Sequence, residues 1–164
     1  MLRRPQFWYW RRLGTGEVPG NFLPFLTQTI GDNMPGWLKG DVLIHSVDPT
    51  NGNPANGEAN VAWTAPQAAT INISGDIWYA QYSDQRSDDY YLFLNGTQLA
   101  SGTVNYMNSN RNNSSFFGAS GLSVNAGDVV EFVIQRSLGQ PYGCAAGLNL
   151  TITESGSEDS IHSR

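Results

Sequence analysis

A two-residue alternation of apolar and polar side chains is the feature that most constrains how this chain folds. It is clearest in residues 69–80 (ATINISGDIWYA). One face of that segment carries Ile71, Ile73, Ile77 and Tyr79, and the other carries Asn72, Ser74, Asp76 and Trp78. Gly75 interrupts the run and is a candidate β-bulge. A period of two predicts a β-strand with one buried face.

Short apolar runs separated by turn residues repeat this pattern along the chain. Further strands are expected at 41–46, 59–64, 90–94, 99–104, 122–124, 128–135 and 148–152. Asn95-Gly96 supplies the positive φ angles of a two-residue type I′ hairpin, and residues 126–128 (AGD) form another turn. Regularly spaced short strands predict an all-β protein, an antiparallel β-sandwich of jelly-roll type.

Three regions follow from composition. Residues 1–29 read as a leader or irregular arm, residues 30–154 as the β-sandwich domain with its core at 40–153, and residues 155–164 as a flexible tail. The first 14 residues (MLRRPQFWYWRRLG) place four aromatic residues between two Arg pairs. That apolar run is too short for a secretory signal, which needs 7–15 apolar residues. An interfacial anchor is the alternative to a leader.

Charge and cysteine content exclude several classes of protein. The chain has 9 Lys or Arg against 14 Asp or Glu residues, and no cluster of cations within the domain that could bind nucleic acid. The single Cys144 excludes an intramolecular disulfide and a zinc site built from several thiolates. No segment has the roughly 18 apolar residues of a membrane-spanning helix.

Residues 40–152 resemble the β-sandwich ectodomain of bacterial proteins with a PEP-CTERM surface-sorting tail. The matching segments are GDVLIHSVDP (40–49), VAWTAPQAATINISGDIW (61–78), YLFLNGTQLASG (91–102), LSVNAGDVVEFVI (122–134) and GLNLTI (147–152). More loosely, they are similar to jelly-roll carbohydrate-binding modules. The resemblance implies a jelly-roll sandwich located at the cell surface or in an extracellular matrix. The Pro-Glu-Pro motif, terminal apolar helix and Arg cluster of the sorting tail are missing from this sequence.

Catalysis has weak support in the sequence. His45 and His162 are the only histidines, and no Gly-x-Ser-x-Gly motif surrounds a serine, so a serine hydrolase is not expected. A glycoside hydrolase would need two carboxyl groups on either side of the scissile bond. Asp76 and Glu131 are the best such pair, if one sheet brings them together. The simpler interpretation is that both are solvated, and we expect no enzyme.

Sugar recognition is the sharper hypothesis, because sugars stack on aromatic rings and their hydroxyls need polar partners. Candidate residues lie in a strand–loop–strand unit and in a later loop that could converge at one end of the sandwich. They are Trp78, Tyr82, Arg86, Asp88, Tyr106 and Arg111. We therefore expect a non-enzymatic extracellular module that binds polysaccharide or matrix glycan. A purely structural surface protein is the alternative.

Calcium is the only cofactor that the sequence suggests. The loop at 48–57 and the residue after it are rich in the oxygen ligands that Ca²⁺ prefers, although the EF-hand spacing is absent. The candidate ligands are Asp48, Asn53 and Glu58. Asx residues also stabilise turns without any ion, so the loop chemistry has an ordinary structural interpretation as well.

Overall fold

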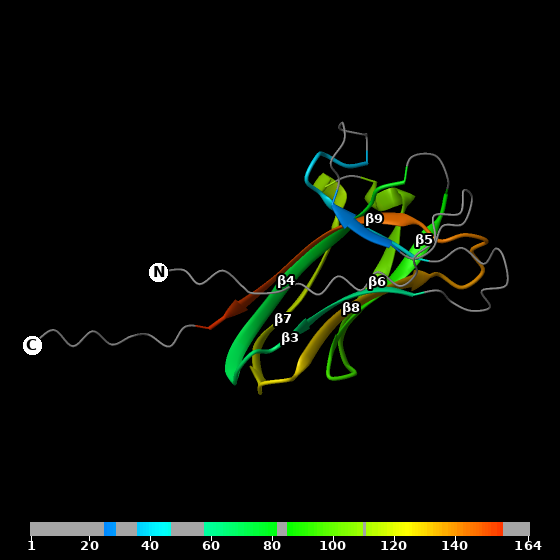
Figure 1. Cartoon of the computed structure of the whole chain (residues 1–164). Helices are drawn as coiled ribbons and strands as arrows, with labels where there is room; N and C mark the ends of the chain where they lie inside the picture. Colours follow the sequence, from blue (N-terminus) through cyan, green and yellow to red (C-terminus); the bar gives the residue numbers. More distant parts are fainter. Residues whose placement is uncertain (1–24, 29–35, 47–57, 82–84, 110, 156–164) are drawn as a thin grey trace, which may run out of the picture.

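Nine β-strands and two single 3₁₀ turns make up the described part of the chain (Figure 1). The computed structural model describes residues 25–28, 36–46, 58–81, 85–109 and 111–155. The elements are β1 (Phe25–Gln28), β2 (Val42–His45), β3 (Ala59–Thr64), β4 (Ala69–Tyr79), β5 (Ser87–Leu94), β6 (Thr97–Asn105), η1 (Tyr106–Asn108), η2 (Arg111–Asn113), β7 (Ser115–Val124), β8 (Val129–Arg136) and β9 (Ala145–Glu154). No helix in these residues is long and apolar enough to cross a membrane.

The strands form two antiparallel sheets with jelly-roll connections. One sheet has five strands in the order β1-β2-β9-β4-β7, and the other has four in the order β3-β8-β5-β6. Pairing is nested: β5 pairs with β6, β4 with β7, β3 with β8, and β2 with β9. A long hairpin whose two arms are rolled into two sheets gives this order. The predicted fold class is therefore confirmed.

The core lies between the two sheets and is built from the predicted inward positions. Ile71, Ile73 and Ile77 of β4 are at most 2% exposed, and Phe132 and Ile134 of β8 are fully buried. All of these side chains belong to one apolar cluster. The period of two seen in the sequence thus separates core from surface, because alternate side chains of a strand point to opposite faces.

Several local features differ from the sequence-based expectations. Gly75 pairs regularly with Phe117 and Leu150, so it is not the bulge. The register shift lies between Ile71 and Ile73, and the extra residue is on β7, where Gly121 has a φ of 68°. β1 pairs with β2, which places residues 25–28 in the sheet rather than in the arm. The aromatic–Arg segment and the tail from residue 156 lie outside the described residues.

The connections that carry most candidate site residues lie at one end of the sandwich, which we call the loop end. There β2, β4, β6 and β8 end, and β3, β5, β7 and β9 begin, as the register pairs Tyr79–Ala146, Ile77–Ser115 and Ser87–Asn105 show. The opposite end carries tight turns, including the predicted hairpin, in which Asn95 and Gly96 have φ angles of 50° and 78°. This topology places the β4–β5, β6–β7 and β8–β9 connections at the same end of the sandwich.

Candidate functional site

Trp78 is buried on the outer face of the five-stranded sheet, although the sequence marks it as a candidate ligand-binding residue. It lies opposite Gly147 of β9, and its indole occupies the space above that glycine. A Cβ atom at residue 147 would collide with the ring. The indole Nε1 donates a hydrogen bond of 2.8 Å to the Gly36 carbonyl, and the side chain is fully buried. In this position Trp78 supports the surface, and its ring is not exposed to solvent.

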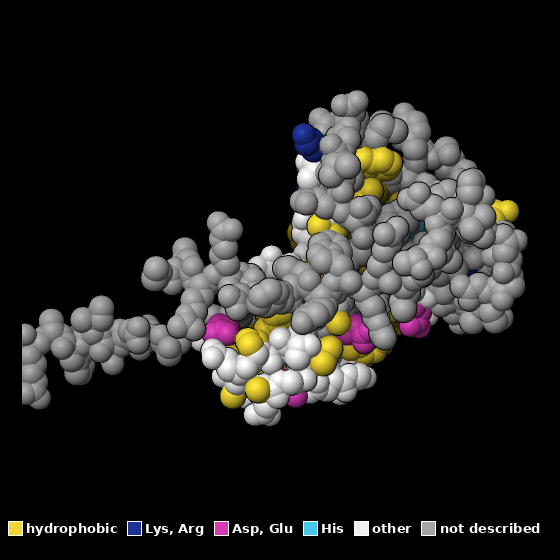
Figure 2. All heavy atoms as spheres, viewed as in Figure 1, with side chains coloured by type: hydrophobic (Ala, Val, Ile, Leu, Met, Phe, Trp, Pro, Cys, Tyr) yellow, Lys and Arg dark blue, Asp and Glu magenta, His cyan; other side chains and the backbone are white. Residues whose placement is uncertain are grey.

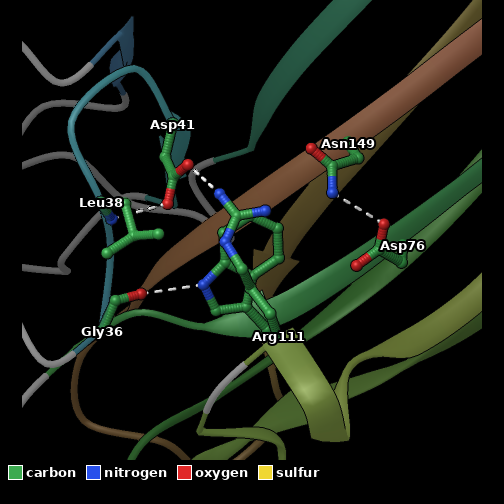
Figure 3. Close-up of polar contacts among 7 residues, drawn as sticks. Gly36, Leu38, Asp41, Asp76, Arg111 and Asn149 are labelled. Carbon is green, nitrogen blue, oxygen red and sulfur yellow. Dashed lines mark hydrogen bonds and ion pairs between the residues drawn. The ribbon is translucent and has the colours of Figure 1, made fainter.

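Arg111 stacks on the Trp78 ring. Figure 3 shows its guanidinium group directed at the carboxylate of Asp41. Its guanidinium carbon lies 4.4 Å from the ring centroid, and its Nη2 forms an ion pair with Oδ1 of Asp41. The second oxygen of Asp41 accepts a hydrogen bond of 2.8 Å from the Leu38 backbone NH. The Arg111 side chain remains 39% exposed, whereas that of Asp41 is 7% exposed. Arg111 is therefore fixed in place and still accessible.

Asp88 lies inside the loop end, where it connects the two sheets. Its Oδ1 accepts a hydrogen bond of 2.9 Å from Ser46 Oγ and one of 3.3 Å from the Cys144 backbone NH. The carboxyl group is fully buried. Burial raises its pKa to about 6, although the Ser46 hydrogen bond acts in the opposite direction. Asp88 thus holds β2, β5 and the start of β9 together and has no surface for a ligand.

Arg86 and Tyr142 form an aromatic–cationic pair at the loop end. The guanidinium carbon of Arg86 lies 4.9 Å from the Tyr142 ring centroid, and its Nη1 donates a hydrogen bond of 2.9 Å to the Gly143 carbonyl. Tyr142 is 41% exposed. The pair comes from two loops, which are the β4–β5 and β8–β9 connections. Tyr106 is 49% exposed in η1, on a third connection.

The predicted ligand-binding residues therefore separate into groups with different environments. Trp78 and Asp88 are buried, Arg111 stacks on Trp78, Arg86 stacks on Tyr142, and Tyr106 is exposed. Because Trp78 and Asp88 have no exposed surface, the described candidates do not line one common pocket. Tyr82 lies outside the described residues.

Calcium binding remains a prediction. Asp48 and Asn53 lie outside the described residues, and Glu58 is exposed just before β3. Within the part of the chain that the structure describes, no three His, Cys, Asp or Glu side chains gather closely enough to hold a metal ion.

Asp76 and Glu131 do not form the hydrolase pair that the sequence allowed. Asp76 lies on the outer face of the five-stranded sheet, where it accepts a hydrogen bond from Asn149. Glu131 points away from the core of the four-stranded sheet and accepts a hydrogen bond of 2.6 Å from Asn60. The whole core separates the two carboxyl groups, so that interpretation was wrong.

Sequence reasoning missed Asp41, Gly147 and Phe116. The first two matter through contacts with Arg111 and Trp78, which are distant in the sequence. Phe116 is 81% exposed at the start of β7 and is the most exposed aromatic side chain of the described residues. The sequence feature that could have indicated it is the pair Phe116-Phe117, because a strand that buries one of two adjacent rings exposes the other.

The described surface is poor in positive charge. Figure 2 shows acidic side chains spread among apolar and uncharged ones, without an extended basic patch on the described part of this face. This agrees with the low cation content of the sequence and argues against a polyanionic ligand there.

Comparisons with known proteins give neither a family nor a close relative. No family model and no curated protein matches the chain, so the resemblance to PEP-CTERM ectodomains finds no support there. Solved structures with weak similarity include the CBM36-1 domain of a multidomain xylanase from the hindgut metagenome of Trinervitermes trinervoides, with 12% identity, a TM-score of 0.42, and coverage of 87% of this chain and 90% of that one.

Two further carbohydrate-binding modules show comparable similarity. The C-terminal CBM6 of LamC, a marine laminarinase from Zobellia galactanivorans, has 12% identity and a TM-score of 0.40, covering 84% of this chain and 93% of its own. A CBM36 in complex with calcium and xylotriose has 13% identity and a TM-score of 0.36, and the match covers 80% of this chain and 93% of that one. Similarity this low assigns neither a family nor a ligand to this chain.

Proposed function

We propose that the chain is a non-catalytic module that binds polysaccharide at the loop end of the sandwich. The observation that carries the proposal is the uneven distribution of exposed aromatic rings. Tyr106 and Tyr142 are 49% and 41% exposed on the loop-end connections. The tight turns of the opposite end, at residues 65–68, 95–96 and 125–128, contain no Phe, Tyr or Trp.

Exposed rings beside fixed polar groups suit sugars, which combine apolar C–H faces with hydroxyl groups. Arg86 is held by the Tyr142 ring and the Gly143 carbonyl, so little side-chain entropy is lost when it binds a hydroxyl. A location outside the cell is part of the same proposal. It is supported by the surface chemistry, in which Asn, Ser and Thr take the place of charged residues.

The test is affinity electrophoresis of the purified chain in gels containing neutral β-glucan, xylan or mannan, with a polyuronate as the charged comparison. We expect retardation by at least one neutral polysaccharide and a clear loss of retardation for Tyr142→Ala. Phe93→Ala is the control, because Phe93 lies on β5 of the four-stranded sheet, near the end that is opposite the loop end. Unretarded migration of the wild type in every gel would exclude the proposal.

A purely structural surface protein is the second candidate. It is favoured by the burial of Trp78 and Asp88, two of the residues that the sequence marks for binding. The same gels separate the two candidates, because a structural protein would migrate equally with and without polysaccharide.

A further inference from the structure

A strip of three side chains crosses the outer face of the five-stranded sheet beside the covered Trp78. Asp76 of β4 lies directly opposite Phe116 of β7 on one side and Asn149 of β9 on the other. Directly opposed residues of antiparallel strands place their side chains on the same face, about 5 Å apart at Cβ. The strip is therefore a ring, a carboxylate and an amide in a row, roughly 10 Å across.

The polar half of the strip is ordered and has unused hydrogen-bonding capacity. Asn149 Nδ2 donates a hydrogen bond of 2.8 Å to Asp76 Oδ1 (Figure 3). Among the described residues, Asp76 Oδ2 and Asn149 Oδ1 have no partner. The second N–H of the Asn149 amide is also unused there. Two acceptors and one donor side by side match neighbouring hydroxyl groups, each of which donates and accepts.

The surroundings of the strip select an uncharged ligand. The next row of the sheet contains Ser74, with Gly118 and Thr151 opposite it, so the surface beside the strip is small and uncharged. On the other side the face is closed by Arg111, whose charge is already paired with Asp41. A phosphate or carboxylate ligand would be repelled by the Asp76 carboxylate, and the Arg111 guanidinium beside the strip is already paired with Asp41.

From these contacts we infer that the strip Phe116–Asp76–Asn149 is a second sugar-binding subsite, located on the outer face of the five-stranded sheet and specific for neutral glycans. A sugar stacks its C–H face on the Phe116 ring and directs neighbouring hydroxyls to Asp76 and Asn149. The inference rests on the proposed function and adds to it a location and a charge class of ligand. A polysaccharide chain that reaches both subsites binds more tightly than one that reaches either alone.

The experiment measures binding of neutral β-glucan, xylan and mannan and of a polyuronate to four proteins by affinity electrophoresis. The proteins are the wild type, Phe116→Ala, Asn149→Ala and the control Thr153→Ala, and Tyr142→Ala is measured beside them as the loop-end variant. Thr153 lies on the same strand as Asn149, two rows away. Phe116→Ala should weaken binding of the neutral polysaccharide at least about tenfold, because a stacked aromatic ring is lost. Asn149→Ala should weaken it less, and Thr153→Ala should bind as the wild type does.

The outcomes separate this inference from the function on which it rests. If the wild type binds no polysaccharide, both fail. If Tyr142→Ala loses binding while Phe116→Ala and Asn149→Ala bind normally, the loop end binds sugar and the strip does not. Preferred binding of the polyuronate would also overturn the inference. If Phe116→Ala instead converts a dimer into a monomer in light scattering without weaker glycan binding, the strip is a contact between copies of the chain. Asn149→Ala keeps the test valid if Phe116→Ala fails to fold.

Discussion

The guanidinium group of Arg111 lies 4.4 Å from the centre of the Trp78 ring and forms an ion pair with Asp41. This arrangement makes a small second core on the outer face of the five-stranded sheet. The Gly36 carbonyl and the backbone of Gly147 complete it. A tryptophan that would otherwise be exposed on a polar face becomes fully buried, and Arg111 is held next to the strip Phe116–Asp76–Asn149.

Replacing Arg111 tests this outer core. Arg111→Met should lower the free energy of unfolding by about 1–2 kcal/mol, because it removes the stacking contact and leaves Asp41 without its cation. Urea denaturation gives the value. Asp41→Asn in the Arg111→Met background should cost less than it does in the wild type, since the two groups act as a pair. Fully additive losses would contradict the pairing.

Gly147→Ala tests the contact between β9 and Trp78. A methyl group at residue 147 would collide with the indole, so the ring or the strand must move. We expect a loss of about 1–3 kcal/mol in the free energy of unfolding, as for other overpacked sites. The thermal midpoint and the urea midpoint should both fall. In the double variant with Trp78→Leu, most of the cost of the added methyl group should disappear, and an unchanged cost would refute the steric explanation.

Asp88 should make stability depend on pH in the direction opposite to that of most carboxylates. Its pKa is raised from 3.8 to about 6 by burial, so the folded state binds a proton that the unfolded state releases between these two pH values. Stability from this group is therefore fully present below pH 4 and is lost as the pH rises to about 6. The loss is on the order of 3 kcal/mol.

The variant Asp88→Asn isolates this effect. It retains Oδ1, the acceptor for Ser46 and for the Cys144 backbone NH, but it cannot ionise. Urea midpoints of both proteins, measured from pH 4 to pH 8, should show the wild type losing stability relative to Asp88→Asn as the pH rises. Parallel curves over the whole range would show that Asp88 does not titrate in this window.

Cys144 should be unreactive in the folded protein. It is fully buried, and burial raises the pKa of its thiol, with a further contribution from the Asp88 carboxylate. Both effects reduce the thiolate that alkylating reagents attack. Labelling with iodoacetamide at pH 8 should be slow in buffer and complete in denaturant, as followed by mass spectrometry. Because Cys144 is the only cysteine, the labelled fraction also reports unfolding directly.

The alternation of side chains was sufficient to predict the fold class and most strands. Residues 59–64 were predicted as a strand and form β3 with the same ends. The first half of β7 was missed because Gly118 and Gly121 interrupt its apolar pattern. β1 was missed because the Pro and Gly residues before it indicate an irregular segment.

The environments of the candidate site residues were much harder to predict. Local pattern placed Trp78 on an outer face, which is correct, but its burial depends on Gly36, Gly147 and Arg111. These residues come from three distant parts of the chain, and the alternation of side chains does not indicate which of them come into contact. Asp88 was taken for a surface ligand residue for the same reason, since Ser46 and Cys144 reach it only in the folded protein.

The nested pairing of the strands has a consequence for the order of folding. The β5–β6 hairpin closes around Asn95-Gly96 with the shortest loop, whereas β2 meets β9 across most of the described chain. Contacts at such large sequence separation slow folding, and two-state sandwiches of this kind fold in milliseconds to seconds. We expect nucleation at the hairpin and growth outward through β8 and β4. The pairing of β2 with β9 then closes the sheet late, and Trp78 is among the last side chains to leave water.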